Sequence, residues 1–198
     1  METRLSKMFD YYKDFSTPKL IEKRLKQKFK PGDYVFVSDM GDAWARSIDM
    51  KWQAAVVAVA RLNPETNFLY MTKDPLGYCH FERNAFAFPD NVLLGVTMET
   101  NRGTKKISHA PDPLARYLYF MNVQHKRKFV SIEPIMDFDL EELVSWMKEL
   151  KPEAVAVGYD NYKNNLVEPS LVKTNNLIVR LAEFTKVYTK TLRYPVFG

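Results

Sequence analysis

Two glutamates in apolar surroundings are the residues of this sequence best suited to chemistry. Glu133 stands in the segment Ser-Ile-Glu-Pro, and Glu99 directly follows a methionine. An unpaired carboxylate is costly to bury, so we expect each glutamate to face a cation. The candidate cations are Lys73, Arg102 and Lys190. Such pairs are either functional groups or structural ion pairs. In the functional interpretation Glu99 or Glu133 is a catalytic base, and Lys73 is its electrostatic partner.

Further polar residues follow short apolar runs along the chain. They are Ser38, Asp39 and Asp42, then Asp74, then Thr97 and Asn101, then Ser131, then Asp160 and finally Arg193. The alternative for the aspartates is structural, because Asp also caps helices and stabilises turns. Asp42, Asp74 and Asp160 are therefore equally well explained as caps.

The chain offers few soft metal ligands. Cys79 is the single cysteine of the 198 residues, which excludes an intrachain disulfide, a Cys-based zinc site and an iron–sulfur cluster held by this chain alone. The three histidines, His80, His109 and His125, follow no ligand spacing. We predict no metal site.

Six short apolar runs must position these polar residues. They are 34–38, 68–72, 92–97, 128–132, 154–158 and 186–189. Each run is nearly continuous rather than alternating, which is typical of strands buried on both faces of a parallel sheet. Their spacing corresponds to about one βα unit per run.

The segments between the runs carry helical patterns. We expect helices over 18–29, over 52–59, over 140–150 and from Pro169 to about residue 181. Pro31-Gly32-Asp33 should end the first of them. Residues 99–112 form the longest polar loop, which we predict to be the most mobile element.

Alternation of strand and helix predicts an α/β fold, either an open doubly wound sheet or a barrel. The chain lacks both G-x-G-x-x-G and G-x-x-x-x-G-K-[ST], which argues against a nucleotide-binding Rossmann or P-loop domain. We therefore predict one domain over 1–198, a partial TIM-like (β/α) barrel with about six parallel strands and flanking helices. Its site should lie at the carboxyl ends of the strands.

The net charge of +5 raises the question of a nucleic-acid partner. Basic residues gather over 19–30 and 126–128, where they would either meet phosphates or form a solvated helix face. No apolar stretch is long enough to span a membrane, and the first residues do not resemble a signal peptide. We expect a cytoplasmic protein without membrane contact.

Four segments in order carry a family resemblance. They are VFVSDMGD (35–42), FLYMTKDP (68–75), NVLLGVTMET (91–100) and KFVSIEPIM (128–136). Over about residues 10–160 the chain resembles the radical S-adenosylmethionine (SAM) superfamily, in its phage-protein-like and spore-photoproduct-lyase-like branch. The resemblance implies a (β/α) barrel with SAM lying across the strand ends. It also implies a [4Fe–4S] cluster held by a C-x-x-x-C-x-x-C loop after the first strand.

The sequence departs from this family at the cluster loop, because no C-x-x-x-C-x-x-C is present. We expect the N-terminal strand and cluster loop, which would precede about Leu5, to be missing. The chain is then a cluster-free relative, one half of a split enzyme whose partner supplies the cysteines, or a fragment. Without the cluster, SAM binding should be weak or absent.

The resemblance also implies site residues. Lys73, Thr97, Glu99 and Ser131 would meet SAM, and Glu133 would lie on the substrate side. The remaining residues of the expected SAM-like pocket are Ser38, Asp39 and Asn101.

Three functions stay open at this point. The first is a non-catalytic or partner-dependent remnant of the radical-SAM barrel with a polar small-molecule pocket. The second is an acid–base enzyme that uses Glu99 or Glu133 with Lys73. The third is a nucleic-acid-associated protein. An incomplete barrel leaves an open edge, so a partner chain or a second copy is expected there.

Overall fold

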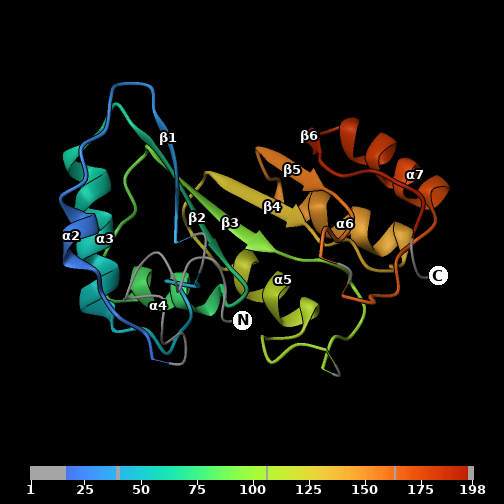
Figure 1. The fold of residues 1–198 in the computed structure, drawn as a ribbon, viewed down its shortest axis with the longest axis horizontal. Coiled ribbons are helices and arrows are strands. Elements are labelled where there is room, and N and C mark those ends of the chain that lie inside the picture. The colour runs from blue at the N-terminus through green and yellow to red at the C-terminus, as the bar shows by residue number, and fades with distance from the viewer. Residues whose placement is uncertain (1–16, 39–40, 106, 163, 196–198) are drawn as a thin grey trace.

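Six parallel strands form a curled half-barrel in this computed structural model, which describes residues 17–38, 41–105, 107–162 and 164–195 (Figure 1). The strands lie side by side in sequence order. They are β1 (Tyr34–Val37), β2 (Asn67–Thr72), β3 (Val92–Thr97), β4 (Lys128–Ile132), β5 (Ala154–Val157) and β6 (Lys186–Thr189). The predicted partial (β/α) barrel of about six parallel strands is confirmed.

One helix precedes β1 and the others alternate with the strands, on the outer face of the sheet. They are α2 (Glu22–Leu25), α3 (Met50–Leu62), α4 (Leu76–Arg83), α5 (Pro113–Met121), α6 (Leu140–Leu150) and α7 (Leu171–Ala182). Connections between neighbouring parallel strands are right-handed, so strands in sequence order place their helices on one face. None of the helices in the described ranges has the length and hydropathy needed to cross a membrane.

The residues of each strand alternate between the helix layer and the inner face. On β2, the hydroxyl of Tyr70 donates to the carbonyl of Val56 in α3, so Tyr70 faces the helices. Its neighbour Met71 lies on the other face, where its sulfur would be 2.1 Å from a Cβ added at Gly95. This alternation and the strand register assign every strand residue to one face.

Two helix predictions were wrong in their bounds. The helix expected over 18–29 is a single turn, α2. Its N-cap, Ile21, makes no side-chain hydrogen bond to the helix start, and the basic residues of this segment repel one another at helical spacing. Pro169 precedes α7, whose N-cap is Ser170, with its side chain accepting from the amide of Lys173.

Aromatic rings fill the space between the sheet, α3 and α4. Trp44 is buried at the centre, with ring centroids 5.1–5.4 Å from its neighbours. These neighbours are Tyr70, Tyr78, Phe81 and Phe88. Gly77 of α4 lies so close that an added Cβ would be 1.7 Å from the carbonyl oxygen of Trp44. The carboxyl end of β2 is thus fixed against a tightly packed outer layer.

Candidate functional site at the carboxyl ends of the strands

A buried glutamate joins two cations at the carboxyl ends of β2 and β3. Lys73 Nζ lies 2.6 Å from Glu99 Oε1, and Arg116 Nη1 lies 2.8 Å from Glu99 Oε2. The Glu99 side chain is 7% exposed and that of Arg116 is 0% exposed, whereas Lys73 is 41% exposed. The group therefore presents one ammonium to the mouth of the half-barrel above a buried carboxylate and guanidinium.

The backbone holds Glu99 in an uncommon conformation. Its φ of +62° is in the left-handed region, which costs a non-glycine residue free energy and persists where the surroundings determine it. Those surroundings include the amide of Met136, which donates to the carbonyl of Glu99 at 3.0 Å. The hydroxyl of Thr100 also donates to the carbonyl of Asp137 at 2.7 Å. The strand β3 end is thereby tied to the segment after β4.

Arg116 is a site residue that the sequence interpretation missed. It projects from α5 and donates to the carbonyls of Pro111 and Thr97 at 2.6 and 3.0 Å as well as to Glu99. Its Nη2 has no hydrogen-bond partner among the residues that the structure describes. A signal was present in the sequence: Arg116 shares the buried face of α5 with Tyr117, and a charge on such a face requires a buried partner.

Asp42 connects the loop after β1 to the loop after β2. Its carboxylate accepts from the hydroxyl of Thr72 at 2.8 Å and from the amides of Lys73 and Trp44 at 2.9 and 3.0 Å. Burial raises the pKa of Asp42, and these hydrogen bonds oppose the increase. The role is structural: Asp42 fixes the backbone of Lys73 and so aims its side chain.

A second pair lies at the ends of β4 and β6. Lys190 Nζ is 2.8 Å from Glu133 Oε2, and the Ser131 hydroxyl is 3.3 Å from the same oxygen. Gly158, at the end of β5, makes the approach possible, because a Cβ there would be 2.8 Å from Glu133 Oε1 and 3.1 Å from Lys190 Cβ.

The two groups share one rim. Thr97 pairs with Ser131 in the register of β3 and β4, and Lys73 comes one residue after the Thr72–Val96 pair of β2 and β3. Lys73, Thr97 and Ser131 therefore follow one row across the inner face, and Glu133 lies just beyond it. The row brings together most of the residues that the sequence placed at the mouth.

Two predicted positions lie elsewhere. The side chain of Asn101 is exposed and bonds the carbonyl of Asp139 and Glu142 at the start of α6, so it does not join the mouth. Arg102 pairs with Asp137 and Asp139 rather than with either glutamate. Both side chains are bound by groups of the 137–142 segment, so they are not directed to the glutamates of the mouth. Asp39 lies outside the described residues.

The other two aspartates of the strand ends have local partners. Asp160 accepts from the amides of Tyr162 and Asn164, and so stabilises its own turn. Asp74 accepts from the amide and guanidinium of Arg46. The structural interpretation is sufficient for both.

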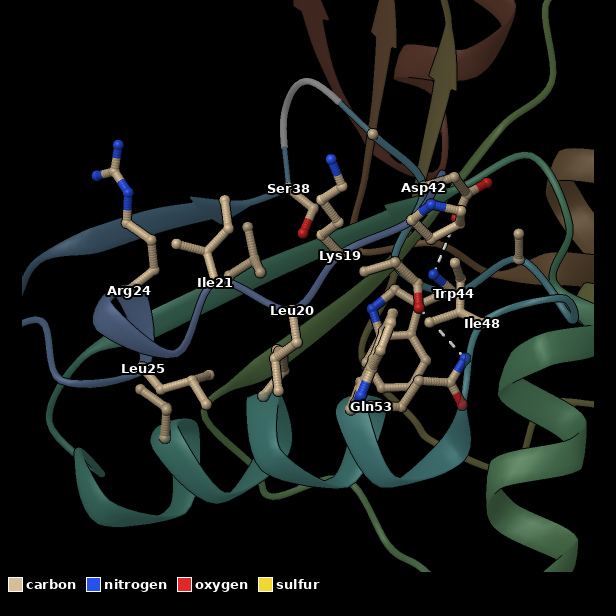
Figure 2. A pocket seen from close by; sticks show the side chains of 18 of the residues that line it. Lys19, Leu20, Ile21, Arg24, Leu25, Ser38, Asp42, Trp44, Ile48 and Gln53 are labelled. Atoms are coloured by element: carbon tan, nitrogen blue, oxygen red, sulfur yellow. Dashed lines mark hydrogen bonds between the residues drawn. The ribbon is translucent and has the colours of Figure 1, made fainter. Parts of the chain in front are cut away.

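Ser38 lies in the wall of a separate cavity of about 800 Å³ between the 17–29 segment, β1 and α3. Figure 2 shows Leu20 and Leu25 directed toward α3, with Ser38 and Asp42 at the polar end. The apolar lining suits a hydrocarbon group rather than the charged parts of SAM. Asp42 is the shared wall between this cavity and the Lys73 loop.

The residues present do not fit a [4Fe–4S] cluster. Cys79 is buried in α4, on the outer layer, with its thiol 3.2 Å from the carbonyl oxygen of Tyr119. Burial raises the pKa of this thiol, which opposes the thiolate that a metal requires. Within the described ranges no group of three or more His, Cys, Asp or Glu side chains could hold a metal ion.

One comparison with known proteins gives a match. A family model with the description "Protein of unknown function (DUF5131)" matches residues 1–158, which include β1 to β5 and both charged groups of the mouth apart from Lys190. No curated protein and no solved structure matches the chain.

Proposed function

This chain belongs to the DUF5131 family of proteins of unknown function, and we propose that it is a radical-SAM-like half-barrel that binds a small zwitterionic ligand at the carboxyl ends of its strands. SAM is the ligand we propose. The chain holds no cluster ligands of its own, so radical chemistry would require a partner chain that supplies the cysteines. By itself it is a binding protein.

The observation that carries this proposal is the group Lys73–Glu99–Arg116. Two cations share one carboxylate, so the group has an excess positive charge, and the half-exposed member is Lys73. This ammonium suits a ligand carboxylate. On the same rim Glu133 uses Oε2 for Lys190 and Ser131, which leaves Oε1 to accept from a ligand ammonium. An amino-acid moiety such as that of SAM carries both charges.

Calorimetric titration with SAM tests this proposal. We expect weak binding to the wild-type chain, with a Kd of roughly 0.1–1 mM, and a loss of about tenfold or more in Lys73→Met. Lys51→Met is the matched control, because Lys51 is an exposed lysine of α3 on the outer layer. Absence of heat at millimolar SAM, or equal binding by the Lys73 and Lys51 variants, would contradict the proposal.

A second candidate is acid–base chemistry, which we propose only for Glu133. Both oxygens of Glu99 already hold cations, so Glu99 is a poor proton acceptor in this arrangement. Within the described residues Glu133 bonds Lys190 and Ser131 through Oε2, and its Oε1 lies against Gly158. Of the two glutamates it is the one with an open lone pair.

Replacing Glu133 with glutamine should leave the fold intact. Its pair with Lys190, whose side chain is 62% exposed, is solvated, so the free energy of unfolding should fall by less than about 1 kcal/mol. Ligand binding should weaken severalfold, because glutamine cannot neutralise an ammonium. Urea unfolding and calorimetry measure the two effects, and Glu153→Gln, which removes an exposed partner of Arg127, is the control. Unfolding of Glu133→Gln would identify Glu133 as structural.

A further inference from the structure

The two edge strands expose aromatic side chains on the inner face of the half-barrel. Tyr34 and Phe36 of β1 are 58% and 52% exposed, and Tyr188 of β6 is 46% exposed. Their neighbours Val35 and Val187 pack against the core on the other side of the sheet. Aromatic residues at the two ends of the curl therefore face its hollow.

Charged and titratable groups from both edges of the sheet surround Tyr34 on β1. Partial burial raises the pKa of Tyr34; Arg127 lowers it, and Tyr188 and Glu153 add further increases. Strands β1 and β6 are the two edges of the sheet, with β2 to β5 between them.

Apolar side chains lie over the middle of the inner face, between the edge strands. Gly95 pairs with Met71 on one side and with Phe129 on the other, and a Cβ there would be 2.1 Å from the Met71 sulfur and 3.3 Å from the Phe129 ring. Glycine at this position lets both side chains lie over β3. Ala154 and Ala156 of β5 lie on the same face of the sheet and are buried.

Cations border this apolar surface. Lys186 Nζ lies 4.7 Å from the centre of the Tyr188 ring, so its charge rests on a π face. A second cation, Lys73, lies at the carboxyl end of the same face, where it donates to Glu99. Among the described residues, Glu99, Glu133 and Glu153 are each paired with a cation, and Glu99 is paired with two. The face therefore has an excess of positive charge.

We propose that this inner face binds single-stranded nucleic acid, with bases stacked on Tyr34, Phe36 and Tyr188 and phosphates held by Lys186 and Lys73. Exposed aromatic rings beside cations are the surface that unpaired bases and their backbone recognise. A parallel sheet face with an open side admits a flexible strand. A duplex keeps its bases stacked and offers them no ring to stack on. The proposal shares Lys73 with the ligand site proposed for the mouth, so its test rests on Lys186 and the three aromatic residues, which that ligand site does not include.

Fluorescence anisotropy with a fluorescein-labelled oligothymidine of about 12 nucleotides, a length within the usual site sizes, tests this surface. We expect binding that weakens linearly in log Kd against log salt. Tyr34→Ala, Phe36→Ala and Tyr188→Ala should each weaken it by roughly 5- to 100-fold. These side chains are exposed, so the variants should fold, which circular dichroism checks.

The chain contains a matched control for the cation and its ring. Lys148 Nζ lies 5.5 Å from the centre of the Phe184 ring on the helix layer, the same pair type as Lys186 and Tyr188. Lys148→Gln and Phe184→Ala should leave oligothymidine binding unchanged, whereas Lys186→Gln weakens it. No binding at low salt would overturn the proposal. Salt-dependent binding that responds equally to both pairs would show a general polyanion surface and would overturn it as well.

Discussion

Replacing Glu99 with leucine is expected to lower the free energy of unfolding by about 3–5 kcal/mol, the usual cost of removing one partner of a buried ion pair. The reason is Arg116, whose side chain is 0% exposed and whose Nη1 lies 2.8 Å from the Glu99 carboxylate. Leucine leaves that guanidinium buried with only the carbonyls of Pro111 and Thr97 as partners. Neutral carbonyls do not replace a counter-charge.

The double variant Glu99→Leu with Arg116→Met separates this cost from other effects of the substitution. Removing both charges removes the unpaired guanidinium, so much of the lost stability should return. Urea unfolding of the wild-type chain, both single variants and the double variant completes the cycle. A Glu99→Leu variant that loses less than about 1 kcal/mol would show that Arg116 is hydrated and that this pair does not organise the site.

Replacing Gly77 with alanine is the second substitution with a large expected effect. The new methyl carbon would be 1.7 Å from the carbonyl oxygen and 2.9 Å from the carbonyl carbon of Trp44. Both are backbone atoms, which no side-chain rotation can move. Helix α4 must therefore shift away from the Trp44 aromatic cluster, and we expect a loss of about 3 kcal/mol or more.

Gly103→Ala is the matched control for Gly77→Ala. A Cβ at Gly103 meets nothing within 4 Å, so this variant should retain the wild-type melting temperature or gain slightly from a less flexible unfolded chain. Thermal unfolding followed by circular dichroism measures the melting temperature of both variants. Equal melting temperatures for the two variants would refute the close packing of α4 on Trp44.

The architecture followed from the sequence because its signals are local. Each of the six apolar runs coincides with a strand to within a residue or so. The expected burial on both faces holds for β3 and β5, where a strand is nearly continuous in apolar residues, but it was wrong for the edge strands β1 and β6, which contain exposed residues. The prediction of a helix over 18–29 was wrong for a local reason as well. The apolar pattern was present, but the start of α2 lacks a side-chain cap and the segment is dense in lysine.

The site was predictable only where a strand end fixed the position. The backbone of β2 and β3 brings Lys73 near Glu99 at the neighbouring strand end, so the topology alone predicts their approach. Arg116 comes from α5, and its entry beneath Glu99 depends on how that helix packs. Ser38 and Asn101 also follow strands, but each joins a different neighbour: the first the cavity beside α3, the second the start of α6.

Methionine methyl groups offer the most direct test of where a ligand binds. Met71 lies two residues before Lys73, and the amide of Met136 donates to Glu99, whereas Met121 ends α5 on the outer layer. In a methyl-labelled chain, with signals assigned by Met→Leu substitution, titration with SAM should shift the Met71 and Met136 signals and leave Met121 in place. Shifts confined to Met121, or none at saturating SAM, would contradict a ligand site at the carboxyl ends of the strands.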